Sequence, residues 1–130
     1  MGVSNRKEKP ESVFGAERLT AREKAELAAR EVGELKATDV VILDVRDAVA
    51  LADYFVICTG DTKRHIRALA KRIQSTSKDK GFAVHHTEGE SAAKWILMDL
   101  NNVVVHIFDQ EAREFYELER LWGDAPRLEA

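Results

Sequence analysis

The sequence predicts a single α/β domain in which a mixed sheet of about five strands is packed by helices. Segments with helical spacing of apolar residues alternate with short β-branched runs, in the order helix, two strands, helix, three strands, helix. The 130 residues, 45% of them hydrophobic, are enough for one core. Because so few helices are predicted, we expect them to leave part of the sheet uncovered.

The first predicted helix begins after Thr20 and ends near Ala37. Thr20 and Glu23 have the spacing of a capping box, in which each side chain accepts a hydrogen bond from the other residue's backbone N–H. The apolar positions that follow at helical spacing are Ala25, Ala28, Ala29 and Val32. This pattern predicts an amphipathic helix.

Two strands are predicted next, at residues 40–45 and 54–58. The first is nearly all apolar and β-branched, which is typical of a strand buried on both faces. The second contains Cys58, the only cysteine, so no internal disulfide can form. We expect a buried, unreactive thiol and a reducing compartment.

The second helix is predicted to start at an N-cap formed by Asp61 or Thr62 and to stop at Gly81. Its apolar stripe consists of Ile66, Leu69, Ala70 and Ile73. Beside the stripe, three basic residues recur four positions apart, namely Lys63, Arg67 and Lys71. Such a row is typical of a solvated helix face, and it also suits a contact with RNA phosphates.

A short strand is predicted at residues 82–86, followed by a hairpin whose strands are residues 95–100 and 103–108. Asn101 and Asn102 suit a type I′ turn, in which both central residues have positive φ.

The last helix is predicted from Glu111 to about residue 121. The domain then spans residues 19–123, between a flexible leader at 1–18 and a polar tail at 124–130. The leader is basic but lacks an apolar stretch, so we predict no secretory signal.

A two-residue turn fixes the register of the hairpin, pairing Trp95 with Phe108 and Leu97 with His106. One face is then wholly aliphatic, with Ile96, Met98, Leu100, Val103, Val105 and Ile107. The opposite face carries Trp95, Leu97, Asp99, Val104, His106 and Phe108.

This second face mixes aromatic rings with a carboxylate and an imidazole. The carboxylate and the imidazole indicate that this face is not deeply buried, because burying an unpaired charge in a core costs free energy. An aromatic anchor with polar surroundings is typical of a protein interface. The alternative is a sheet face that the chain's own C-terminal helix half covers, and the residues alone leave both hypotheses open.

Composition and charge exclude some classes of function. The net charge of −3 means that bulk electrostatics do not favour nucleic acid. The chain has no run approaching the roughly 18 apolar residues that a membrane span requires. We therefore predict no membrane contact.

A phosphate-handling enzyme is the main alternative to a binding protein. Gly60 precedes a helix N-terminus that could hold an anion, but Asp61 would repel phosphate. Asp44 and Asp47 lie three apart across a strand end and point to different faces, whereas two-metal phosphoryl transfer needs convergent carboxylates. We predict no catalysis, no metal and no cofactor, and keep a nucleotidyltransferase-like enzyme as the weaker hypothesis.

Several short motifs occur in a fixed order along the chain. They are LDV at 43–45, DYFVICTG at 53–60, RHI at 64–66, EG at 88–89, Trp95 with Asp99, VVVH at 103–106 and YELERLW at 116–122. This ordered set resembles the ribosomal silencing factor family (RsfS, also called Iojap-like). The resemblance extends from about Ala21 to Gly123.

The resemblance implies a nucleotidyltransferase-like fold without catalysis. It also implies a partner, the universal fourteenth protein of the large ribosomal subunit, at the face where the small subunit docks. Family members block subunit joining there and repress translation when nutrients are scarce, and organelle relatives act in ribosome assembly. We therefore expect a translation repressor of the bacterial cytoplasm, with a large-subunit assembly factor as the alternative.

The resemblance also implies that the hairpin tryptophan, here Trp95, belongs to the contact with the ribosomal protein. Together with its neighbours on the aromatic face and a nearby acid, the expected contact set is Trp95, Leu97, Asp99, His106, Phe108 and Glu88. The basic row of Lys63, Arg67 and Lys71 is the candidate for a peripheral rRNA contact. An exposed aromatic face also suits burial in a homodimer away from the ribosome.

Overall fold

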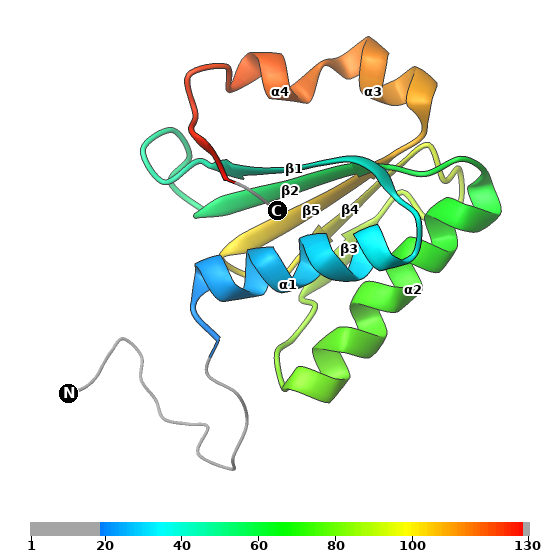
Figure 1. The fold of residues 1–130 in the computed structure, drawn as a ribbon, viewed down its shortest axis with the longest axis horizontal. Coiled ribbons are helices and arrows are strands. Elements are labelled where there is room, and N and C mark those ends of the chain that lie inside the picture. Colours follow the sequence, from blue (N-terminus) through cyan, green and yellow to red (C-terminus); the bar gives the residue numbers. More distant parts are fainter. Residues whose placement is uncertain (1–18, 129–130) are drawn as a thin grey trace.

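The computed structural model describes residues 19–128, so the expected leader at 1–18 and the last two residues of the expected tail lie outside the described part. Within these described residues, four helices and six strands follow one another, and Figure 1 shows their arrangement. They are α1 (Ala21–Glu34), β1 (Thr38–Asp44), β2 (Tyr54–Thr59), α2 (Lys63–Lys80), β3 (His86–Glu88), β4 (Trp95–Asp99), β5 (Val103–Phe108), α3 (Gln110–Tyr116), α4 (Leu118–Leu121) and β6 (Arg127–Leu128).

The six strands form one sheet in the order β3-β4-β5-β2-β1-β6. The β2–β5 pair is parallel and the other neighbours are antiparallel, which confirms a mixed α/β sheet. The sixth strand was not predicted. Arg127 and Leu128 pair with Leu43 and Ile42, and Leu128 packs against the core, so part of the expected polar tail forms a sheet edge.

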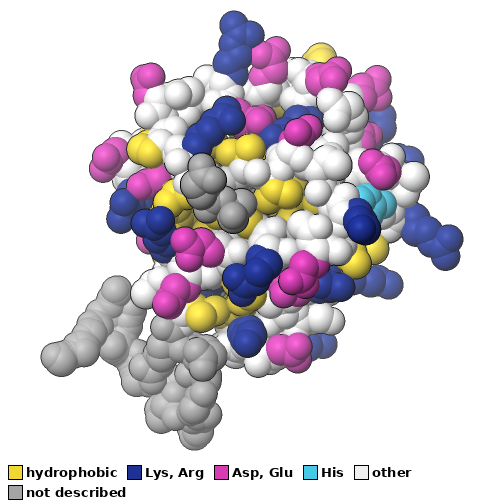
Figure 2. Space-filling view, in the orientation of Figure 1, with side chains coloured by type: hydrophobic (Ala, Val, Ile, Leu, Met, Phe, Trp, Pro, Cys, Tyr) yellow, Lys and Arg dark blue, Asp and Glu magenta, His cyan; other side chains and the backbone are white. Residues whose placement is uncertain are grey.

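Helices cover both faces of the sheet. In Figure 1, α1 and α2 lie below it, and α3 and α4 lie above it. The larger apolar cluster joins α1 and α2 to the sheet and includes the aliphatic face of the hairpin, as predicted. The smaller cluster lies on the other face and joins Phe55 and Phe108 to Ala112 and Leu118 of α3 and α4. The space-filling view shows acidic and basic side chains interspersed around apolar ones (Figure 2).

The predicted ends of the first two helices are confirmed with one adjustment. Thr20 and Glu23 form the capping box, and Thr62 caps α2. Gly81 ends α2 in the left-handed conformation at φ 79°. The first helix stops at Glu34, earlier than predicted, because the chain turns through positive φ before β1 begins. None of the helices within residues 19–128 is long and apolar enough to cross a membrane.

The strand predicted at residues 82–86 is wrong in position, because β3 begins only at His86. His86 pairs with Asp99, the last residue of β4, and the His85 N–H donates to the Asp99 carbonyl at 2.8 Å, so the pairing ends where β4 ends. Phe82 and Val84 pack against the core without joining the sheet ladder.

The hairpin has the predicted register, from Trp95 opposite Phe108 to Asp99 opposite Val104. The type I′ prediction is wrong, because only Asn101 of the two turn residues has positive φ, at 82°. The Asp99 carboxylate accepts the Asn101 N–H at 2.8 Å.

The single C-terminal helix that was predicted is two helices. Glu117 adopts φ 46° between α3 and α4 and breaks the helical path. The side chain of Arg113 bridges this break, because its guanidinium binds Glu119 beyond it.

Candidate functional site: an aromatic groove

An open groove of about 450 Å³ lies between the segment that leads into β4 and helix α3. We call it the aromatic groove. It is lined by Gly89, Ala92, Lys94, Trp95, Glu111, Ala112, Phe115 and Tyr116. Loop, strand and helix therefore each contribute a wall to one surface feature.

Trp95 is the best-anchored aromatic side chain of the groove. Its indole stacks on Phe108 with ring centroids 5.0 Å apart, and Tyr116 lies 4.8 Å away. Its Nε1–H donates a hydrogen bond of 3.1 Å to Nδ1 of His106. Half-buried and held on several sides, Trp95 presents a rigid apolar surface of the kind that anchors interfaces.

The prediction that His106 avoids deep burial is wrong. The residue is only 4% exposed, and the ring of Phe55 packs edge-on against the imidazole with ring centroids 4.8 Å apart. Burial lowers the pKa of His106 to about 4, which keeps the imidazole neutral near pH 7. With Nδ1 accepting from Trp95, the proton of the neutral ring is assigned to Nε2.

Phe108 is fully buried beside His106. Both residues support Trp95 from below and offer little surface to a partner. For these two residues the alternative hypothesis is correct: the C-terminal part of the chain covers this region of the sheet face, through α3 and α4.

The remaining members of the expected contact set, Glu88, Leu97 and Asp99, lie on the sheet beside the groove, and we call this surface the ledge. Leu97 and Asp99 are half-buried on the face that carries Trp95, and Glu88 lies directly opposite Leu97 in the neighbouring strand. The exposed Glu88 carboxylate bonds to Nε2 of His86 at 2.6 Å. The structure therefore brings Glu88, Trp95, Leu97 and Asp99 to one accessible surface.

Of the groove-lining residues, only Trp95 belongs to the expected contact set, and the sequence reasoning missed two exposed aromatic residues in particular. Phe115 is 76% exposed and Tyr116 is 48% exposed, both on α3. Two adjacent aromatic residues cannot both point inward from a short helix, and this was the signal available in the sequence.

Arg113 fixes the helical wall to the sheet. Its guanidinium donates to the Asp39 carbonyl at 2.7 Å, to the Thr59 hydroxyl at 2.9 Å and to the Glu119 carboxylate at 2.7 Å. Burial acts to raise the pKa of Glu119, but the hydrogen bonds and charge of Arg113 hold it below its ordinary value. Arg113 is buried, and its hydrogen bonds join α3, the helix that carries Phe115 and Tyr116, to β1, β2 and α4.

The three basic residues predicted to face rRNA have different environments on α2. Lys63 Nζ donates to the Ala92 carbonyl at 2.7 Å. Arg67 donates to the Glu90 carbonyl at 3.1 Å and to the Ser91 carbonyl at 2.6 Å. Lys71 is exposed and makes no hydrogen bond or ion pair to the rest of residues 19–128.

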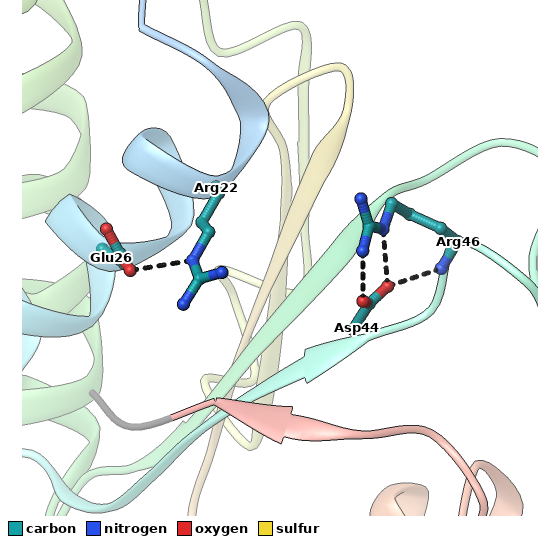
Figure 3. Close-up of polar contacts among 4 residues, drawn as sticks. All are labelled: Arg22, Glu26, Asp44 and Arg46. Carbon is teal, nitrogen blue, oxygen red and sulfur yellow. Dashed lines mark hydrogen bonds and ion pairs between the residues drawn. The ribbon is translucent and has the colours of Figure 1, made fainter.

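The arrangement around Asp44 does not resemble a metal site. Arg46 occupies both carboxylate oxygens with bonds of 2.9 and 2.7 Å, and its backbone N–H adds a third (Figure 3). The side-chain hydrogen bond of Arg46 lowers the pKa of Asp44. No three His, Cys, Asp or Glu side chains within residues 19–128 are placed to share an ion. Cys58 is buried in β2, and burial raises its pKa to about 12.

A comparison with known protein families identifies the family of this chain. Residues 18–130 match the family model described as "Ribosomal silencing factor during starvation". The chain belongs to the ribosomal silencing factor family. The match covers all of the described residues, including those that line the aromatic groove.

Relatives and solved structures agree with this assignment. The chain is 45% identical over 76 residues to ribosomal silencing factor RsfS of Bacillus subtilis, covering 58% of this chain and 64% of the relative. It is 40% identical over 79 residues to RsfS of Halalkalibacterium halodurans, covering 61% and 68%. These matches span about two thirds of the relatives' length. A crystal structure of a Chromobacterium violaceum protein superposes with a TM-score of 0.78 at 31% identity, covering 81% of this chain and 88% of that one.

A more distant relative carries a different name. Mouse "Mitochondrial assembly of ribosomal large subunit protein 1" is 36% identical over 73 residues, which cover 54% of this chain and 32% of the mouse protein. Its name describes assembly of the large ribosomal subunit.

Proposed function

We propose that this protein is a ribosomal silencing factor that binds the large ribosomal subunit and keeps the small subunit from joining it. Membership of the RsfS family over residues 18–130 carries the proposal. In this proposal the protein represses translation under nutrient limitation, and it acts without catalysis because a blocker needs only rigid volume held at the right place. The proposed site of action is the bacterial cytoplasm.

The proposed partner is the universal fourteenth protein of the large subunit, and the proposed contact surface is the aromatic groove with its ledge. Trp95, Phe115 and Tyr116 offer aromatic anchors, and the acids Glu88 and Asp99 lie beside them. Acidic groups at the rim would steer a basic ribosomal protein and fix its orientation. His106 and Phe108 act in this proposal by holding Trp95 in place.

A binding titration with the purified fourteenth protein tests this surface. Phe115→Ala should weaken binding, whereas Leu121→Ala is the matched control, because Leu121 is 70% exposed but does not line the groove. Truncating an interface anchor typically costs about 2 kcal/mol or more, so a roughly thirtyfold loss is expected for Phe115→Ala. Equal binding by both variants would remove the groove from the proposal.

A role in assembly of the large subunit is the second candidate, favoured by the name of the mouse relative. The two roles differ in what accumulates when the protein is absent from its host. An assembly factor leaves precursors of the large subunit during growth. A silencing factor leaves mature subunits and a defect that appears when nutrients run out.

Two further contacts are part of this proposal: a homodimer that forms away from the ribosome, and a peripheral contact with rRNA. Two copies that cover each other's grooves would compete with the ribosome for Trp95. Sedimentation at increasing concentration tests this idea, and a Trp95→Ala variant that dimerises as well as wild type contradicts it. The rRNA contact now depends mainly on Lys71, because Lys63 and Arg67 already bind loop carbonyls.

A further inference from the structure

The loop before β4 is held to helix α2 by two basic side chains. Three consecutive carbonyls, those of Glu90, Ser91 and Ala92, accept hydrogen bonds from Arg67 and Lys63 at distances of 2.6 to 3.1 Å. Hydrogen bonds from charged donors are stronger than neutral ones. The contact joins parts of the chain that are more than twenty residues apart in sequence.

The position of Lys63 indicates a specific role. Lys63 is the first residue of α2, where the helix dipole disfavours a positive charge, and the first turn contains no acid to offset it. Its contact with the Ala92 carbonyl gives the ammonium group a partner there. The guanidinium of Arg67, one turn further on, binds two neighbouring carbonyls with two of its nitrogens.

The clamped loop forms one wall of the aromatic groove and leads directly to its tryptophan. Gly89 lines the groove just before the clamped carbonyls, and Ala92, whose carbonyl is the last of the three, lines it as well. Gly89 has φ +90°, and a Cβ there would lie 2.0 Å from the Trp95 carbonyl oxygen. The Ala93 N–H donates a hydrogen bond of 3.0 Å to the Gly89 carbonyl, which joins the two ends of the loop before β4.

We propose that Arg67 and Lys63 are positioning residues for partner binding, because they hold the loop at 89–93 in the shape that forms the groove. This inference rests on the proposed function of the groove. It gives Arg67 and Lys63 a role in holding the loop, in place of the direct phosphate contact that the sequence predicted for them. Ordering the loop before the partner arrives reduces the entropy lost on binding. The partner thus meets a wall that is already in place.

Amide hydrogen exchange in the free protein tests the clamp without a ribosome. In Arg67→Gln, the amide of Ala93 should exchange roughly tenfold faster, because a charge-assisted contact of the loop is lost. Lys71→Gln is the matched control: it makes the same change of charge one turn away, at a residue with no bond to the loop. An Ala93 amide that exchanges equally in Arg67→Gln and wild type would overturn the clamp.

Binding to large subunits at several salt concentrations tests the consequence. Arg67→Gln should weaken binding with an unchanged salt dependence, and Arg67→Lys should restore little, because an ammonium group lacks the fork that spans two carbonyls. Full rescue by Arg67→Lys, or a shallower salt slope in Arg67→Gln, would show a phosphate contact and overturn the positioning role. If wild type fails to bind, the proposed function fails, whereas the exchange result still decides whether the clamp exists.

Discussion

The indole N–H of Trp95 donates to Nδ1 of His106 at 3.1 Å, within the β4–β5 pair of the sheet. A buried neutral imidazole thereby fixes the orientation of the half-buried tryptophan of the groove. Phe108 stacks on the indole, with ring centroids 5.0 Å apart, and fills the space beneath it in the core. The rigidity of the proposed contact surface thus begins in the core beneath it.

A double-mutant cycle should detect this hydrogen bond. Trp95→Phe removes the donor and His106→Phe removes the acceptor, and each keeps an aromatic ring in place. We expect a coupling free energy of about 1 kcal/mol from urea unfolding of the two single variants and the double variant. Additive effects would mean that the hydrogen bond contributes nothing to stability.

Stability should fall in mild acid because of the same imidazole. The folded-state pKa of His106 is about 4 and its ordinary value is 6.5, so the unfolded chain binds the proton first as pH drops. The stabilising effect of the neutral ring is complete above about pH 6.5 and is lost progressively toward pH 4. Between pH 7 and pH 5 the loss should be about 2 kcal/mol. His106→Phe should lack this component, and an equal pH dependence in that variant would contradict the assignment.

Loss of Arg113 should destabilise the helical wall. Arg113→Met leaves the carboxylate of Glu119 and the carbonyl of Asp39 without their donor in a partly buried setting. We expect a loss of about 3 kcal/mol in the free energy of unfolding. Arg120→Met is the control, since its ion pair with Glu117 is exposed and should change stability by less than about 1 kcal/mol. Similar values for the two variants would contradict the role given to Arg113.

Two glycine-to-alanine substitutions should act in opposite directions. At Gly89 a Cβ would collide with the Trp95 carbonyl at positive φ, so Gly89→Ala should cost about 2 kcal/mol or more and distort the groove. At Gly33, inside α1, a Cβ meets nothing within 4 Å, so Gly33→Ala should stabilise by about 0.5 to 1 kcal/mol. Thermal unfolding of both variants checks the pair. A neutral Gly89→Ala would show that the loop can relax.

Features with local causes could be predicted from the sequence. The capping box at Thr20, the stop at Gly81 and the hairpin register each depend on a few neighbouring residues, and all three are confirmed. The break at Glu117 could not be predicted, because a non-glycine residue with positive φ carries no local signal. Its conformation accompanies the long-range contacts of Arg113.

The site was predicted only in part, for the same reason. Trp95 and its face follow from strand alternation, which is local. The burial of His106 depends on how α3 and α4 return over the sheet, and the loop clamp of Arg67 depends on a contact across more than twenty residues. A basic row at helical spacing looks the same in sequence whether it meets solvent, phosphate or a loop carbonyl.

Subunit joining on a sucrose gradient tests the central claim most directly. Purified small and large subunits are mixed with wild type, with Trp95→Ala, with Phe115→Ala or with the control Leu121→Ala. We predict that wild type and Leu121→Ala sediment with the large subunit and reduce the joined-ribosome peak, and that the two groove variants do neither. A joined-ribosome peak that wild-type protein leaves unchanged would contradict the silencing function.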